Sequence, residues 1–329
     1  MSDQSTARRQ VWRRLTVVVA WAVLTTLLVV GARSVDSSRA LDALRGASAG
    51  WLGVAVAANT VILLFWTGFW RVLLPRGEQV SYARMFAIAA VSSAIMNTVP
   101  FLAGHASSVV LLVRRGGTTR LGALSVLALD QLGEGFAKIS IFLLVGLLTP
   151  LPLWMQGGVV TVSIAVATLL VALLVLAHRH PVPAGPARAE SPRETVVARL
   201  RMFAARASRA LDALRSWRRS LIALACVLAM KAAEAIAIVS VQRSFGVVLP
   251  VSGTLLVLAA LMLATMLPLA PANLGTYEAS VFLAYRYLGV APALALTMAV
   301  IQHLCFLIPS VGIGYAFMTA DARRAIASE

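Results

Sequence analysis

The chain has 329 residues, of which 60% are hydrophobic and only 13% are charged, and its mean hydropathy is +0.85. These values exclude an ordinary soluble domain and are typical of a polytopic membrane protein. A formal charge of +16 raises the question of a nucleic-acid partner. However, the arginines flank apolar segments without the aromatic-basic platform or zinc spacing of a nucleic-acid-binding domain. We therefore attribute the positive charge to membrane topology and expect no nucleic-acid binding.

Six apolar segments are each long enough to cross a hydrocarbon core of about 30 Å as a helix. They cover residues 15–32, 47–70, 121–148, 157–177, 221–241 and 290–318. The first follows paired arginines and is longer than the apolar core of a cleavable signal sequence, so we predict an uncleaved helix. Cys226 and Cys305 lie in apolar runs and predict neither a disulfide framework nor a metal site.

Two further apolar regions, 85–113 and 253–287, are too long for one comfortable span. Each is interrupted by a proline that is followed four residues later by a glycine, at Pro100 and Gly104 and at Pro271 and Gly275. The limb after the first break, 101–113, would extend only about 20 Å as a helix, so it cannot cross alone. We predict two re-entrant helical hairpins with Pro100 and Pro271 at their tips.

The distribution of basic residues supports this topology. With both hairpins returning to the side they enter from, 22 of the 29 basic residues fall on one side of the membrane. Such a bias is expected of cytoplasmic segments. It places both termini in the cytoplasm.

The two interrupted regions resemble each other at a constant offset of 171 positions. This offset relates Val80-Ser81 to Val251-Ser252, Pro100 to Pro271, Gly104 to Gly275, Arg115 to Arg286 and Gln131 to Gln302. The pattern favours an ancient duplication. An odd number of crossings separates the two starts, so the second unit is predicted to be inverted. The predicted fold is an all-α membrane protein with six full transmembrane helices plus two re-entrant hairpins in inverted-topology repeats.

The predicted organisation follows from these segments. A basic tail, the first helix and an external loop (1–46) precede repeat 1 (47–148) and a connecting helix (149–177). A basic cytoplasmic linker (178–220), repeat 2 (221–318) and a cytoplasmic tail (319–329) follow. The linker either carries a surface helix around 195–215 on anionic headgroups or is a solvated connector.

The hairpin tips are candidate anion sites. Non-helical backbone at membrane depth is tolerated only inside protein or beside a wet cavity. The second limb of each hairpin begins at the tip, so its unpaired N–H groups and positive dipole end face the middle of the bilayer. We predict a substrate-binding site formed at the tips by Gly104, His105, Asn273, Gly275, Thr276 and Glu278. The alternative is a proline kink whose glycine packs against a neighbouring helix.

Ionisable residues inside the membrane are the second set of candidates, because they are costly there. Asp130, Glu134 and Lys138 share one helix face, as do Lys231 and Glu234. Lys138 and Lys231 are predicted to attract a phosphate, with the three carboxylates balancing charge or relaying protons. Alternatively, the lysines and glutamates pair to hold helices together. His105 and His303 fit a packing role better than a proton relay.

The sequence does not predict an enzyme. It contains no H-E-x-x-H motif and no P-loop, and its four histidines do not cluster with carboxylates. Asp130 and Glu134 could hold a divalent metal, but two carboxylates followed one turn later by a lysine are weak evidence for a metal site. We expect no catalytic residue, metal or cofactor.

The stretch "LPLAPANLGTYE" followed by "YRYLGVAPALALTMAVIQHL" resembles the flippase-like membrane domain of bacterial lysylphosphatidylglycerol synthases. The earlier "VSYARMFAIAAVSSAIMNTVPFLAGH", "RRGG" and "ALSVLALDQL" resemble the first half of that domain. The resemblance covers most of 47–318. Two departures are a turn poorer in glycine and His105 where the family commonly has a glutamate. The family's soluble aminoacyl-transferase domain is absent, so lipid aminoacylation is not expected.

This resemblance implies a multi-pass protein of the bacterial cytoplasmic (inner) membrane that moves a lipid between leaflets. The substrate would be an anionic or aminoacylated phospholipid or a polyprenyl phosphate, with a lipid-modifying enzyme as a possible partner. Two alternatives remain from the residues themselves. One is a secondary transporter of a small anion, and the other is a non-transporting partner of a lipid-modifying or glycosyl-transfer enzyme.

Overall fold

The computed structural model describes residues 45–99, 103–179, 216–266 and 271–327. These residues form helices and short turns, with no strand among them, which confirms the all-helical fold. The predicted first helix at 15–32, the hairpin residue Pro100 and most of the basic linker, including 195–215, lie outside the described residues.

Four helices form the first unit: α3 (Ala49–Leu73), α4 (Tyr82–Thr98), α5 (Ala103–Gly116) and α6 (Arg120–Leu148). The next helix is α7 (Leu153–Arg179). The second unit consists of α9 (Trp217–Ser244), α10 (Val251–Ala264), the short 3₁₀ turn η2 (Pro271–Asn273), α11 (Thr276–Tyr287) and α12 (Pro292–Ala327). The breaks between α4 and α5 and between α10 and α11 fall where the two prolines interrupt the apolar pattern.

Within the described ranges, four helices are long and apolar enough to cross a membrane: α3, α6, α9 and the Pro292–Asp321 part of α12. The predicted span at 157–177 corresponds to α7, whose described apolar part is Leu153–Thr168. A membrane protein is therefore supported. Six full crossings and re-entrant hairpins stay predictions.

Local sequence explains where several helices begin and end. The Ser81 hydroxyl accepts a hydrogen bond from the Arg84 N–H at the start of α4, and Thr119 accepts one from the Gly122 N–H at the start of α6. The helix predicted to end at residue 318 continues as α12 to Ala327. The stretch 319–327, predicted to be a tail, contains no proline or glycine and is rich in alanine and arginine, which favour helix.

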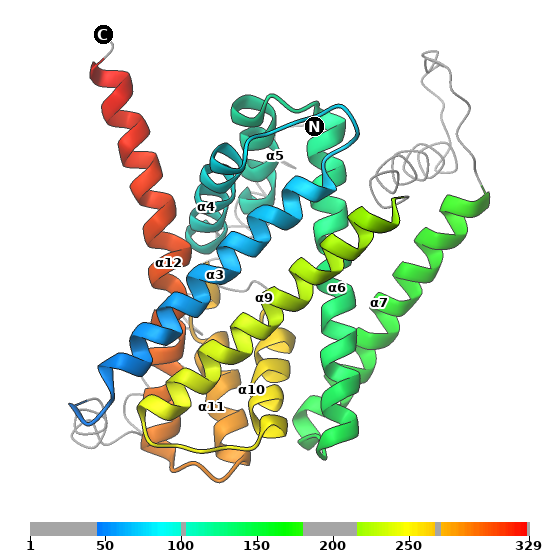
Figure 1. The fold of residues 1–329 in the computed structure, drawn as a ribbon. Helices are drawn as coiled ribbons and strands as arrows, with labels where there is room; N and C mark the ends of the chain where they lie inside the picture. Colours follow the sequence, from blue (N-terminus) through cyan, green and yellow to red (C-terminus); the bar gives the residue numbers. More distant parts are fainter. Residues whose placement is uncertain (1–44, 100–102, 180–215, 267–270, 328–329) are drawn as a thin grey trace, which may run out of the picture.

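The two units repeat the same order of helices at nearly the offset seen in the sequence. Their first helices, α3 and α9, lie side by side and antiparallel (Figure 1). The Ser48 N–H, just before α3, donates to the Ser244 carbonyl at the end of α9 over 2.8 Å. At the other end, Arg219 Nη1 donates to the Leu74 carbonyl over 3.2 Å. An antiparallel pair is the geometry that an inverted duplication requires.

The two helical hairpins enter the molecule from opposite ends and meet near its middle. Helices α4 and α5 pack as one pair and α10 and α11 as the other, while η2 contacts α4 (Figure 1). The last helix of each unit packs against the first hairpin helix of the other, α12 on α4 and α6 on α10. At the α12–α4 contact, Gly314 lies directly against the Ala90 carbonyl, so a larger residue would not fit. The units are thereby interlocked.

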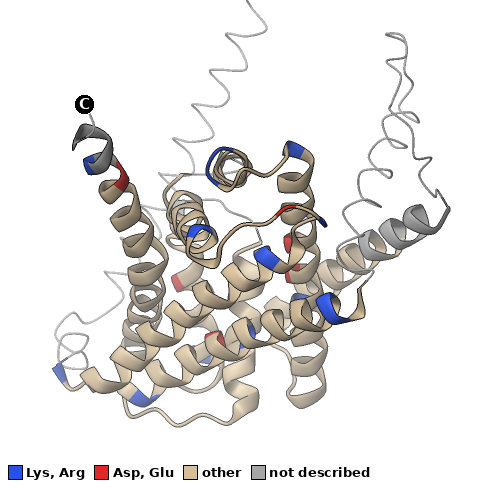
Figure 2. Ribbon diagram, turned by 45° about the horizontal axis from the view of Figure 1, so that its top comes forward, with Lys and Arg blue, Asp and Glu red and all other residues tan. Residues whose placement is uncertain are grey.

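The arginine-rich ends of several helices gather at one end of the fold. The end of α3, the start of α4, the end of α5 and the starts of α6 and α9 all lie there, while few charged residues lie inside the bundle (Figure 2). Arg115 of α5 forms an ion pair with Asp321 of α12 at 2.6 Å. This is the distribution expected of a cytoplasmic face, and the orientation of the termini stays a prediction.

Candidate functional site

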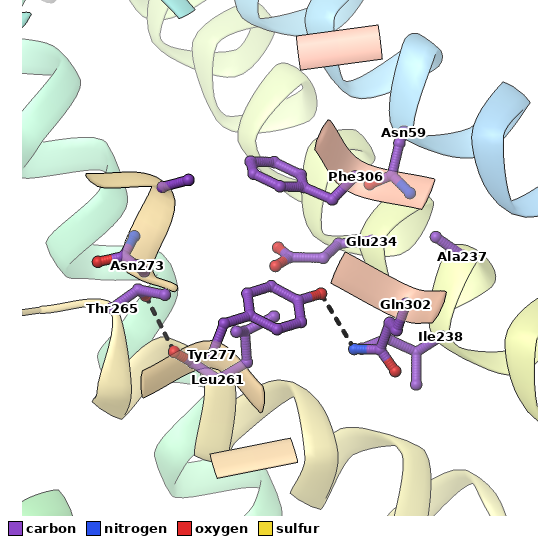
Figure 3. Close-up of a pocket in the computed structure, with 11 residues that line it drawn as sticks. Asn59, Glu234, Ala237, Ile238, Leu261, Thr265, Asn273, Tyr277, Gln302 and Phe306 are labelled. Carbon is purple, nitrogen blue, oxygen red and sulfur yellow. Dashed lines mark hydrogen bonds between the residues drawn. The ribbon is translucent and has the colours of Figure 1, made fainter. Parts of the chain in front are cut away.

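A cavity of about 180 Å³ lies at the break of the second hairpin. It is far larger than the roughly 10–15 Å³ that one water molecule needs. Its walls come from both units: Asn59, Glu234, Ala237, Ile238, Leu261, Thr265, Ala272, Asn273, Tyr277, Gln302 and Phe306 (Figure 3). The broken backbone therefore borders a cavity whose lining includes polar side chains, the setting in which such a break is tolerated at membrane depth.

The tip of the hairpin has a strained backbone. Ala272 and Asn273 have positive φ angles of 54° and 53°. A left-handed conformation costs an L-residue about 1–2 kcal/mol, and asparagine accepts it more readily than alanine. The Thr276 hydroxyl donates to the Asn273 carbonyl over 2.9 Å and closes the turn. The Asn273 Oδ1 atom is buried and has no hydrogen-bond partner among the described residues, so an acceptor at the cavity wall is left unused.

Glu278 fixes the start of α11. Its Oε2 atom accepts from the Gly275 N–H over 2.7 Å, and its Oε1 atom lies 2.8 Å from Nδ1 of His303 in α12. Gly275 itself has a φ of 83°, which only glycine adopts without strain. The Gly275 N–H, which we predicted to bind an anionic ligand, thus already donates to the Glu278 carboxylate. Glu278 instead ties the hairpin tip to α12.

An aromatic and amide network, which the sequence did not predict, supports this tip. The Tyr277 ring stacks on His303 with centroids 4.0 Å apart, and the Tyr277 hydroxyl accepts from Gln302 Nε2 over 3.2 Å. Gln302 Oε1 in turn accepts from the Tyr285 hydroxyl over 3.0 Å. Buried His303 leaves its Nε2 without a partner among the described residues. The one signal that could have found Gln302 was its match to Gln131 at the repeat offset.

The predicted lysines and glutamates form one cluster beside the cavity. Lys231 Nζ lies 3.2 Å from Oε2 of Glu134 in α6 and 3.2 Å from Oε2 of Glu234 in its own helix. Lys138 lies farther away, 3.9 Å from Glu134. Figure 3 shows the Glu234 carboxylate in the space between the rings of Phe306 and Tyr277. The cluster therefore joins the two units and reaches the cavity through Glu234.

Asp130 is separated from this cluster although it shares a helix face with Glu134. Its buried Oδ1 atom accepts from the indole N–H groups of Trp66 and Trp70 over 2.8 and 2.9 Å. Gln131 Nε2 lies 3.4 Å from the other Asp130 oxygen and 3.5 Å from His105 Nε2. These contacts link α3, α5 and α6, so the structure brings Asp130 and His105 together but not with the lysines.

Gly104 serves close packing of the first hairpin. A Cβ atom at this position would lie 2.8 Å from the Cα atom of Met96 in α4, so only glycine lets the two limbs approach. This is the packing alternative considered for the tip glycines. A role for Gly104 in binding a ligand stays a prediction.

One comparison with known proteins finds a family whose model matches the chain. The model of a protein family described as the lysylphosphatidylglycerol synthase TM region matches residues 14–314. The match includes the first unit, the second unit as far as residue 314 and every residue of the site described above. No curated protein matches the chain.

Proposed function

The chain belongs to the lysylphosphatidylglycerol synthase transmembrane family, and we propose that it is a flippase that moves a phosphate-bearing lipid between leaflets. The observation that carries the proposal is the cavity at the break of the second hairpin, whose lining combines polar and apolar side chains. In a bilayer such a cavity offers a headgroup hydrogen-bond partners that the lipid tails lack. The substrate is an anionic or aminoacylated phospholipid or a polyprenyl phosphate.

The headgroup passes through the cavity while the tails stay in the surrounding lipid. The Tyr277 hydroxyl and the amides of Asn59 and Asn273 supply neutral polar contacts. A phosphate would compete with Glu134 and Glu234 for Lys231. Asn59 comes from the first unit and all the other lining residues come from the second, so rocking of one unit against the other would change access to the cavity.

The test has two stages. Mass spectrometry first identifies the lipids retained by gently purified protein, comparing wild type with Lys138→Ala/Lys231→Ala. Selective enrichment of one phosphate-bearing lipid, lost in the variant, is expected. That lipid is then placed in liposomes with the purified protein, and its movement between leaflets is measured. Arg243→Gln, an exposed charge at the end of α9, is the matched control and should transport normally.

Conservative variants distinguish a transport defect from misfolding. Tyr277→Phe removes one hydroxyl from the cavity and keeps the ring that stacks on His303. It should fold normally and transport more slowly. If Lys138→Ala/Lys231→Ala and Tyr277→Phe both move the lipid as wild type does, the cavity is not the route. Uptake of a small anion without lipid movement would instead identify a secondary transporter, and no movement of either would favour a scaffold.

A further inference from the structure

A second hollow lies apart from the proposed transport cavity. This interfacial groove has a volume of about 390 Å³ and lies where the end of α3 meets the start of α9. It is lined by Gly68, Arg71, Val72, Tyr82, Arg219, Ile222 and Cys226. Cys226, the lining residue farthest along α9, precedes the cavity residue Glu234 by eight positions, which is about 12 Å along a helix. The groove therefore belongs to the arginine-rich end of the molecule.

Two guanidinium groups with unused donors stand at the rim of the groove. Arg71 Nε donates to the Val80 carbonyl over 3.1 Å, and Arg219 Nη1 donates to the Leu74 carbonyl over 3.2 Å. Each guanidinium has five N–H donors, and among the described residues no carboxylate lies within ion-pair distance of either. The backbone bonds hold both cations in place. Fixed guanidinium groups with free donors suit a phosphate.

The rest of the lining suits an acyl chain. Val72, Ile222, Gly68 and Cys226 are apolar, and Ile222 is 51% exposed. Trp217, the first residue of α9, is 68% exposed, as expected of an aromatic side chain at the membrane–water interface. Inorganic phosphate would not use the apolar part of this groove. A phospholipid would use both parts.

We propose that the interfacial groove binds one anionic phospholipid, with its phosphate on Arg71 and Arg219 and an acyl chain along the apolar lining. Basic hollows between membrane helices are typical sites for anionic headgroups. Arg71 belongs to the first unit and Arg219 to the second, so the bound lipid bridges the two units at this end. This site is separate from the route of the transported headgroup and needs no transport.

Cys226 provides a probe inside the groove. In a Cys305→Ser background, the rate of its modification by N-ethylmaleimide is measured in nanodiscs that contain phosphatidylcholine and an increasing fraction of phosphatidylglycerol. The rate should fall as phosphatidylglycerol rises. In Arg71→Gln/Arg219→Gln, half-protection should need about thirtyfold more phosphatidylglycerol, because each arginine near an anionic headgroup contributes about fivefold. Arg71→Lys/Arg219→Lys keeps the charge and should retain most of the protection.

A matched variant tests whether the groove or the general surface charge is responsible. Arg76→Gln/Arg84→Gln removes the same charge at the same end of the molecule, and neither residue lines the groove. In this variant, phosphatidylglycerol should protect Cys226 from N-ethylmaleimide as strongly as it does in the wild type. The proposal would be overturned if Cys226 were modified at the same rate with and without phosphatidylglycerol. It would also be overturned if Arg71→Gln/Arg219→Gln and Arg76→Gln/Arg84→Gln lost protection equally. The assay does not measure transport, so its result is independent of the flippase function.

Discussion

Replacing Lys231 with methionine should destabilise the fold, because one lysine serves two carboxylates from different units. Lys231 is 14% exposed, and it lies 3.2 Å from both Glu134 and Glu234, whose side chains are 30% and 23% exposed. Removing one partner of a buried ion pair costs about 3–5 kcal/mol. Since both carboxylates keep some solvent, we expect about 3 kcal/mol. That loss corresponds to a fall of about 4 °C in the midpoint of thermal unfolding.

The assay is thermal unfolding in detergent micelles, with exposed Arg243→Gln as the control. A triple variant, Glu134→Gln/Lys231→Met/Glu234→Gln, removes the stranded charges and should recover most of the lost stability. It should not recover transport if the charges act on the headgroup. A Lys231→Met midpoint equal to that of wild type would refute this reasoning, since it would mean that the paired carboxylates are solvated well enough without the lysine.

Three further outcomes are expected from the packing and the backbone. Gly314→Ala should lower the unfolding midpoint, whereas Gly312→Ala in the same helix should raise it slightly; a Cβ atom collides with α4 only at position 314. If both substitutions change the unfolding midpoint equally, α12 and α4 do not pack as closely at Gly314 as described. Ala272→Gly should be tolerated or mildly stabilising because it relieves a positive φ, while Ala279→Gly, within α11, should cost about 0.5–1 kcal/mol, both by thermal unfolding. Asp130→Asn keeps an acceptor for the two indole N–H groups, so it should unfold well above Asp130→Leu and preserve the tryptophan emission maximum. Similar midpoints for those two variants would argue against the indole bonds.

Among the described residues, the sequence was sufficient to predict most of the helices and the position of their breaks. Long apolar runs predicted α3, α6, α9 and most of α12, since hydropathy and length are local properties. The interruptions at Pro100 and Pro271 predicted one short helix before and one short helix after each break. Helix α12 continues to Ala327, beyond the predicted apolar segment, because the hydropathy falls near residue 318 while the helix propensity does not.

The contacts that the site residues make could not be predicted from hydropathy and helix length. Asp130 and Glu134 share one helix face, and periodicity gives no sign that one contacts two indoles and the other a lysine of α9. Which helix lies opposite a given face depends on how the two units pack, and the periodicity of the sequence does not predict this packing. The stacking of Tyr277 on His303 was missed for the same reason, since the two residues meet only when α11 and α12 pack together.

The interlocked packing of the two units has a consequence for how the chain matures. Helix α4 is complete once Thr98 has been synthesised, but the helix that covers its Ala90 face, α12, begins only at Pro292. At the roughly 5–20 residues per second of protein synthesis, about 10 to 40 s separate the two events. During this interval the small residues of α4 face lipid or a temporary partner, and the same wait does not apply to α6, whose partner α10 follows sooner along the chain. The Ala90 face of the first unit is therefore covered only after most of the second unit has been synthesised.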